Sequence, residues 1–302
     1  MIDFKYIAEK HNYSLELAEF LEKVYNEFLL YYPAEFHSII QEAFLSCPVI
    51  SASNCYTALK DNGLYDENAI GEKIVSDGDL KRASGCYSSN PDIVYDKNSK
   101  TYHIKSIKRG VIFNNSGLNH DYIKAVLIHE LAHLVKAFYA EYEIKGDILF
   151  ERSGLIETQY RLSYDGSKVT KTLIQETGVG LEEGFTSLVE ERITRKIVNP
   201  EYKVVGYGIV KKIASSLSKY EAIITRAEFY KDKKELIDEF QEDYYFELES
   251  VVDTLYSKTL TLFSNLLNPA GRDENIRGID EYIKNVYNPL VEKINDRKKG
   301  RL

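Results

Sequence analysis

Cysteine is scarce in this chain of 302 residues, which contains only Cys47, Cys55 and Cys86. A small, odd number of cysteines in a long chain does not indicate a disulfide framework, and it favours the reduced thiols of a cytoplasmic protein. Their spacing does not fit a zinc knuckle, and no histidine is close to them in sequence. We therefore expect a cytoplasmic protein without disulfides and without a cysteine-based zinc site.

Long apolar runs are also missing. The longest stretch without a charged residue, residues 43–59, is interrupted by Pro48 and by several serines and asparagines, so it does not indicate a membrane span. No apolar segment follows the first residues, and we expect no signal peptide. The net charge of −8 disfavours a nucleic-acid partner. These absences point to neither a membrane nor a nucleic-acid partner.

The chain shows no internal repeat and no low-complexity linker, and its 44% hydrophobic content is ample for a core. The pattern predicts an α+β fold with three regions. Residues 1–90 are expected to be mainly helical, with two helices over 14–46 separated at Pro33 and short helices and loops over 47–90. Residues 91–180 are expected to form a small mixed or antiparallel sheet beside one helix, and residues 181–302 a helical C-terminal lobe.

Strand signals lie on both sides of that helix. Residues 93–95 and 101–107 flank a turn-forming cluster and predict a hairpin, and residues 111–114 predict a separate strand after Gly110. A second hairpin is expected around the turn at residues 164–167. A helix is expected from Leu181 to about Ile197, where Asn199 and Pro200 follow it. From Gly208 onward the pattern is helical.

The sequence H-E-x-x-H occurs once, from His129 to His133, inside an apolar run. Two imidazoles four residues apart on a helix lie about 40° apart around its axis, so both can reach one metal ion. Glu130 lies beside the first ligand, where it can take a proton from a water that the metal activates. A chance match is expected roughly once in a hundred chains of this composition. The alternative is an ordinary core helix with two hydrogen-bonded histidines.

A catalytic zinc ion usually takes three protein ligands and keeps one open position. No histidine follows His133 in the chain. The extended motif with a third histidine is excluded, because Lys136 stands at the glycine position and Tyr139 at the histidine position. The third ligand is therefore a carboxylate, or there is none.

The segment Leu181 to Leu188 has the sequence L-E-E-G-F-T-S-L. Together with the H-E-x-x-H motif, it resembles the gluzincin metallopeptidases, zincins whose third zinc ligand is a glutamate on a later helix, directly before a glycine. The resemblance covers about residues 93–198 and assigns the third ligand to Glu183. The chain has Glu182 where that family often has asparagine, so Glu182 is the alternative ligand. Without a metal, Glu183 would be an exposed carboxylate in a first helical turn.

Physical arguments support the assignment of Glu183 as the third ligand. Gly184 leaves room for two helices to approach a shared metal. Glu190, seven residues after Glu183, lies on the same helix face; it can orient a ligand, although a solvated glutamate is the expected role.

The resemblance implies zinc-dependent hydrolysis of peptide bonds, with Zn²⁺ held by His129, His133 and Glu183 and with Glu130 as general base. A further donor must stabilise the oxyanion, and Tyr207 between Gly206 and Gly208 is the candidate, with simple packing as its alternative role. The strand at residues 111–115 is expected, by analogy with related folds, to form the edge that pairs with an extended peptide or protein substrate.

Two other functions compete with a general peptidase. One is a regulatory protease that cleaves a repressor, which a repressor gene next to this one would favour. The other is a binding protein on a zincin scaffold that has lost catalysis. Glu130 argues against this last alternative, because a structural zinc site needs no general base.

Overall fold

The computed structural model describes residues 2–70, 80, 83–114, 120–204, 207–264 and 269–299. It is a mixed α+β structure with two small sheets, which confirms the expected class. The chain divides into two compact units. Unit 1 comprises Met1–Ser153, Thr158–Gln175 and Val189–Lys203, and unit 2 comprises Gly154–Glu157, Glu176–Leu188 and Val204–Leu302. The division into residues 1–90, 91–180 and 181–302 stays a prediction.

Unit 1 begins with three helices, α1 (Phe4–His11), α2 (Leu15–Tyr31) and α3 (His37–Ser46). The Ser14 hydroxyl accepts a hydrogen bond from the Leu17 N–H at 3.2 Å and caps α2. Pro33 lies between α2 and α3, so the two predicted helices are confirmed. Their packed face is aromatic, and Phe28 and Phe44 meet edge to face with ring centroids 6.0 Å apart.

The first sheet has three strands in the order β1-β4-β3, namely β1 (Val49–Ala52), β4 (Thr101–Asn114) and β3 (Gly85–Asp96). Strand β1 runs parallel to β4, whereas β3 and β4 form the predicted hairpin. The expected break at Gly110 is wrong, because β4 continues through it; a Cβ atom there would lie 2.9 Å from Leu64 Cδ1, so this glycine serves close packing. Helix α4 (Cys55–Asp61) packs against this sheet.

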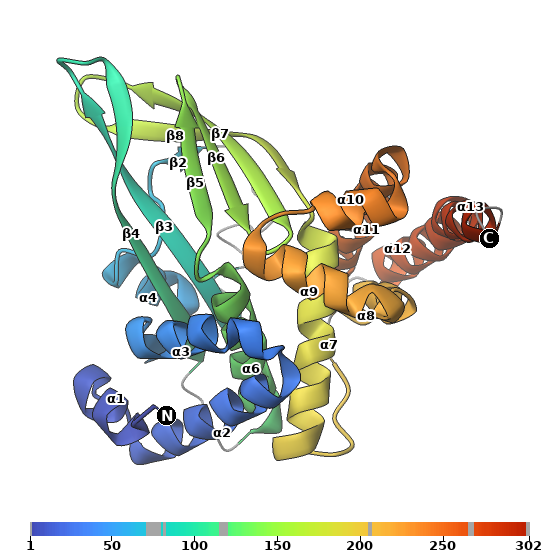
Figure 1. Cartoon of the computed structure of the whole chain (residues 1–302), viewed down its shortest axis with the longest axis horizontal. Helices are drawn as coiled ribbons and strands as arrows, with labels where there is room; N and C mark the ends of the chain where they lie inside the picture. The colour runs from blue at the N-terminus through green and yellow to red at the C-terminus, as the bar shows by residue number, and fades with distance from the viewer. Residues whose placement is uncertain are drawn as a thin grey trace. The chain divides into compact units, whose positions relative to one another are not determined.

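The second sheet has the order β2-β8-β7-β6-β5 (Figure 1). Its strands are β2 (Ala69–Ile70), β5 (Glu141–Lys145), β6 (Ile148–Ser153), β7 (Ile156–Tyr164) and β8 (Val169–Thr177). The predicted β7–β8 hairpin is confirmed, and Asp165 stabilises its turn by accepting from the N–H groups of Ser167 and Lys168. At the far end of the β3–β4 hairpin, Tyr95 stacks on Tyr164 with centroids 4.8 Å apart.

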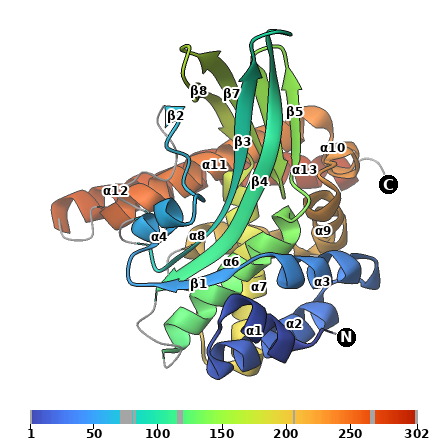
Figure 2. The same ribbon diagram turned by 90° about the vertical axis from the view of Figure 1, so that its left-hand side faces the viewer.

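Helix α6 (Asp121–Ala137) belongs to unit 1 and packs against β3 and β4 (Figure 2). It is buried almost throughout, as its apolar sequence requires. Helix α7 (Val179–Ile197) matches the second predicted helix. It is continuous, and it contributes its first ten residues to unit 2 and its remaining nine to unit 1.

Unit 2 is otherwise helical in its described part, as the pattern after Gly208 predicted. Its helices are α8 (Gly208–Ser216), α9 (Glu221–Tyr230), α10 (Lys234–Phe240), α11 (Glu242–Ser264), α12 (Pro269–Tyr282) and α13 (Asn288–Lys299), and a π-helical turn (Ile283–Tyr287) joins the last two. Helix α11 is the centre of this unit, because it contacts α8, α10, α12 and α13 and buries Leu248, Val252 and Leu255 completely.

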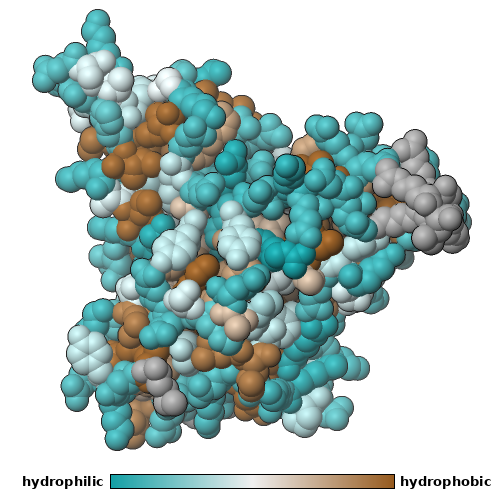
Figure 3. Space-filling view, in the orientation of Figure 1, coloured by the Kyte–Doolittle hydropathy of each residue, from teal (hydrophilic) through white to brown (hydrophobic). Residues whose placement is uncertain are grey.

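Within the described residues, no helix is long and apolar enough to cross a membrane. The face of the molecule in Figure 3 is hydrophilic over most of its area, with hydrophobic side chains in separate small patches. Scattered apolar side chains of this kind are normal on a protein surface.

Candidate metal centre

The two motif histidines meet on one face of α6. His129 is 6% exposed, and its Nε2 atom lies 3.1 Å from Nε2 of His133. Two histidine nitrogens that each coordinate one tetrahedral zinc at 2.0–2.1 Å are about 3.3 Å apart. The two lone-pair atoms therefore have nearly the separation that a shared metal ion requires.

A buried hydrogen-bond chain orients the first histidine. His129 Nδ1 lies 2.9 Å from Oε2 of Glu190, and the Tyr202 hydroxyl lies 2.5 Å from Oε1 of the same carboxylate. Burial and the Glu190 carboxylate raise the pKa of Tyr202, so its hydroxyl keeps its proton and donates. Because an ionised carboxylate only accepts, Nδ1 of His129 carries the hydrogen and Nε2 presents its lone pair.

The sequence suggested a solvated side chain for Glu190, and this expectation is wrong. Glu190 is only 5% exposed and bonds to His129 across 61 residues of sequence. Its position seven residues after Glu183, on the same helix face, is the only sequence signal for this role. Tyr202 was missed entirely, because nothing in its neighbourhood marks a loop tyrosine as a partner of a buried glutamate.

Tyr202→Phe is expected to weaken zinc binding about tenfold, because loss of the hydroxyl leaves the Glu190 carboxylate one donor short and loosens its hold on His129. A competition titration with a chromogenic zinc chelator measures the change. Tyr220→Phe, at another buried tyrosine in the short 3-10 helix Ser218–Tyr220, is the matched control. Equal zinc affinity in Tyr202→Phe and the parent protein would show that this chain does not support the site.

Glu183 completes the cluster. Its carboxylate, His129 and His133 each offer a ligand atom, and these atoms all lie within 4.8 Å of one another. Glu183 lies two turns before Glu190 on the continuous helix α7, so both side chains leave the same face. Two imidazole nitrogens and one carboxylate oxygen form the donor set of many catalytic zinc sites. The residues present therefore fit a zinc ion.

Glu182 occupies a different environment. It is 2% exposed, and its Oε2 accepts a hydrogen bond from the Leu155 N–H at 2.9 Å in the turn between β6 and β7. Gly154, with a φ of +61°, precedes that residue, and a Cβ atom there would lie 2.4 Å from the Glu182 carboxylate. Glu182 is thus the acceptor for a tight backbone turn, and Glu183 is the carboxylate that reaches the histidines.

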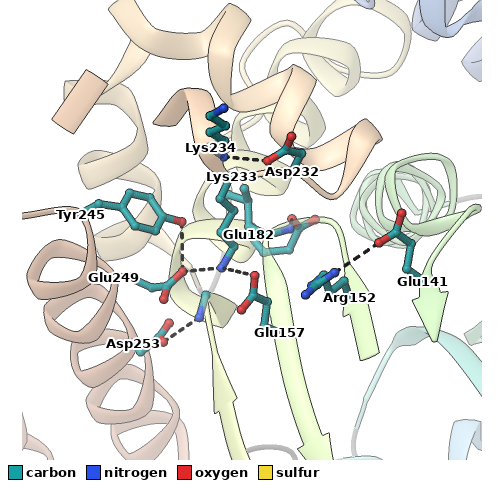
Figure 4. Close-up of polar contacts among 12 residues, drawn as sticks. Glu141, Arg152, Glu157, Glu182, Asp232, Lys233, Lys234, Tyr245, Glu249 and Asp253 are labelled. Carbon is teal, nitrogen blue, oxygen red and sulfur yellow. Dashed lines mark hydrogen bonds and ion pairs between the residues drawn. The ribbon is translucent and has the colours of Figure 1, made fainter. Parts of the chain in front are cut away.

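A second carboxylate holds the start of α7 within unit 2 (Figure 4). Asp253 accepts hydrogen bonds from the N–H groups of Gly178 at 2.8 Å and Gly180 at 2.7 Å. Burial raises its pKa to about 6. Beside it, Lys233 pairs with Glu249 at 2.7 Å. The first N–H groups of a helix have no partner within the helix and are stabilised by negative charge, so this network fixes the first turn of α7, close to Glu183 in sequence.

Gly184 does not serve the close approach to α6 that its position suggested. A Cβ atom at Gly184 would lie 2.7 Å from the carbonyl oxygen of Val210 and 3.2 Å from Cβ of Ala214, both in helix α8. The glycine therefore brings α7 and α8 together within unit 2.

Glu130 points to the edge of the first sheet. Its Oε2 accepts a hydrogen bond of 2.6 Å from the backbone N–H of Tyr87 in β3. Gly85 makes room for it, because a Cβ atom there would lie 2.5 Å from Val126 Cγ1 and 3.1 Å from Glu130 Cγ. One oxygen of the proposed base is thus held by the main chain.

Tyr207 lies beside another tyrosine in unit 2. Its ring centroid is 5.8 Å from that of Tyr256, and the two hydroxyls are hydrogen-bonded. Burial and then the nearby Glu183 carboxylate raise the pKa of Tyr256 well above its usual value. Tyr256 therefore lies near Glu183, the candidate third ligand, whereas the role of Tyr207 stays a prediction. Of the two glycines expected to flank it, Gly208 begins α8 and Gly206 lies outside the described residues.

The strand expected to form the substrate edge is not an edge. Residues 111–114 belong to β4, which has β1 on one side and β3 on the other, and Asn115 lies outside the described residues. The prediction was wrong because β4 pairs with a segment that is distant in sequence. Residues 49–52 form a parallel strand next to residues 111–114. The strand at the edge of this sheet and next to α6 is β3.

Comparison with known proteins gives no match to a family model, to a curated protein or to a solved structure.

Proposed function

We propose that the protein is a zinc-dependent metallopeptidase with a zincin-like arrangement of the gluzincin type. The convergence of His129 and His133, with the second ring nitrogen of His129 bonded to buried Glu190, carries the proposal. A metal-binding histidine typically donates its other ring N–H to a carboxylate, so the Glu190 contact favours a ligand role over a simple Nε2–H···Nε2 hydrogen bond between two core histidines.

His129, His133 and Glu183 would hold the zinc ion. When bound, zinc acts as a Lewis acid that makes a water molecule acidic and polarises the peptide carbonyl. The arrangement favours zinc over magnesium or calcium, which prefer sites made wholly of oxygen atoms.

Glu130 supplies the proton transfer. Its Oε2 accepts from the Tyr87 N–H, so the main chain holds the carboxylate in place, and this carboxylate is proposed to take a proton from water. The same carboxylate then passes the proton to the nitrogen of the leaving amine. Glu130 directly follows His129 on helix α6. The helix backbone therefore fixes how far the proposed base lies from the proposed metal ligand.

A phenol is proposed as the donor to the developing oxyanion. Tyr207 stands next to Tyr256 and near Glu183, and its proton can bond to an oxygen that gains negative charge. Tyr256 is 1% exposed, so it forms a fixed support for the more exposed ring of Tyr207.

Strand β3 is proposed to align the substrate. The Val111 N–H bonds to Pro48 on the β1 side of β4, so the N–H and C=O groups of its partner Tyr87 face away from β4, where the N–H bonds to Glu130 and the C=O faces the proposed substrate. An extended peptide that pairs with this edge would lie next to Glu130. A peptide or protein is therefore the substrate class that the site favours.

Removal of the metal is expected to abolish peptide cleavage, because both the acidity of the water and the polarisation of the carbonyl depend on it. The purified protein is incubated with a mixed peptide library before and after treatment with 1,10-phenanthroline, and the products are identified by mass spectrometry. About one zinc per chain and recovery of cleavage when zinc is added back are expected. Cleavage that survives complete zinc removal would contradict the proposal.

A further inference from the structure

Two of the three cysteines lie together in unit 1, although 31 residues separate them in sequence. Cys55 is the first residue of helix α4, and Cys86 is the second residue of strand β3. Cys55 belongs to a small buried cluster with Leu59, Leu64 and Ile112, and Cys86 packs against that cluster. Both thiols are free, and the fold brings them together because α4 covers β3 and β4.

The two thiols are close enough for each to change the pKa of the other. The thiols are hydrogen-bonded to each other, and Cys55 Sγ also donates to the Ala83 carbonyl at 3.3 Å. The hydrogen bond from Cys86 lowers the pKa of Cys55, whereas the same bond and burial raise the pKa of Cys86. Cys55 is therefore the thiol that more readily becomes a thiolate, which is the form that attacks an oxidised sulfur at Cys86.

Small molecules can reach this pair from one side. Cys86, but not Cys55, lines a cavity of about 150 Å³ that continues along β3 past Tyr87 and Ser89. Cys55 is 1% exposed and Cys86 is half-buried. A cavity of this size admits hydrogen peroxide but not a protein thiol oxidase.

We propose that Cys55 and Cys86 form a site of reversible oxidation, at which hydrogen peroxide converts the two thiols into a disulfide next to the proposed general base. In the first step Cys86 takes one oxygen atom from peroxide, which gives a sulfenic acid and one water molecule. In the second step the Cys55 sulfur attacks that sulfur, the S–O bond breaks, the S–S bond forms and a second water leaves with the remaining proton. The two sulfurs lose two electrons, which reduce the O–O bond.

The disulfide acts on the site through the neighbours of Cys86, and this part of the inference rests on the proposed function. Gly85 packs on Val126 and Glu130, and the Tyr87 N–H holds the Glu130 carboxylate. An S–S bond is about 2 Å long, much shorter than the contact between two hydrogen-bonded thiols. Its formation therefore draws β3 toward α4 and moves the N–H group that fixes Glu130. Displacements of about 1 Å at a catalytic group can lower activity about a hundredfold.

Intact-mass analysis after treatment with a small excess of hydrogen peroxide tests the site. We expect the parent protein to lose two mass units and a peptide digest to show Cys55 linked to Cys86. Cys47→Ala is the control and should lose the same two units, whereas Cys55→Ala and Cys86→Ala should not. Met1 is the only methionine, so its oxidation adds one oxygen at a known peptide. A disulfide that involves Cys47, or thiols that progress to sulfinic acid without a linked intermediate, would overturn the inference.

Activity measurements separate this inference from the proposed function. Oxidation is expected to lower peptide cleavage tenfold or more in the parent and in Cys47→Ala, with recovery under dithiothreitol, and to leave Cys86→Ala unaffected. Linked cysteines without any effect on cleavage would overturn the coupling to Glu130. If the untreated protein cleaves no peptide, the peptidase proposal fails, while the mass measurement still decides whether the oxidation site exists.

Discussion

Glu130→Gln is expected to lower kcat/KM for peptide cleavage about 10²- to 10⁴-fold while the protein keeps its zinc. Glutamine has the same shape, and its amide oxygen can still accept the Tyr87 N–H, so the position of the side chain is preserved. It cannot accept a proton from water. The measurement is steady-state cleavage of a peptide found in the library screen, with metal content determined on the same sample.

Glu19→Gln is the control for this change, since it makes the same substitution at an exposed position in α2. It should retain parental cleavage and parental zinc content. Cleavage by Glu130→Gln at the parental rate would exclude Glu130 as the base. If the parent protein contains zinc but cleaves no peptide, the result would instead favour the alternative of a binding protein on a zincin scaffold that has lost catalysis.

Substitution of the two adjacent glutamates is expected to give opposite effects. Glu183→Gln should weaken zinc affinity at least about 100-fold with little change in the free energy of unfolding, because a ligand oxygen with negative charge becomes a neutral amide. Glu182→Gln should keep the zinc site but lower the free energy of unfolding by about 1–3 kcal/mol. The new amide NH₂ group is a hydrogen-bond donor, and it would be buried where the Leu155 N–H, also a donor, needs an acceptor.

Zinc titration and urea unfolding of the two variants measure these effects, with the unfolding done on the metal-free proteins. Each variant is the control for the other, since the change is chemically identical and the positions are neighbours. Unchanged zinc affinity in Glu183→Gln together with lost affinity in Glu182→Gln would transfer the ligand role to Glu182.

The parts of the fold that the sequence predicts are those set by local pattern. Helices α6 and α7 follow from continuous apolar periodicity, and the turn at Asp165 follows from a residue type that hydrogen-bonds its own backbone. The pairing of His129 with His133 follows from helix geometry alone. Each of these inferences needs only residues within a few turns of one another.

The parts that escaped prediction depend on contacts between distant segments. Strand β1 pairs with β4 across 62 positions of sequence (Val49 with Val111), so the edge of the sheet next to α6 is β3. Tyr202 reaches Glu190 from a loop, and no periodicity marks that tyrosine. The two thiols meet because α4 lies over the sheet, and the sequence separation of 31 residues gives no sign of it.

The turn at Gly154 has a consequence for how variation in this chain should be interpreted. Gly154 and Gly178 both adopt positive φ, and a side chain at either would collide with the Glu182 carboxylate or with the Leu155 carbonyl. The atoms nearest to a Cβ at either glycine belong to none of the three proposed ligands. A tolerance map from saturation mutagenesis would nevertheless rank both among the least replaceable positions, so intolerance to substitution around the metal centre should not be taken by itself as a sign of catalysis.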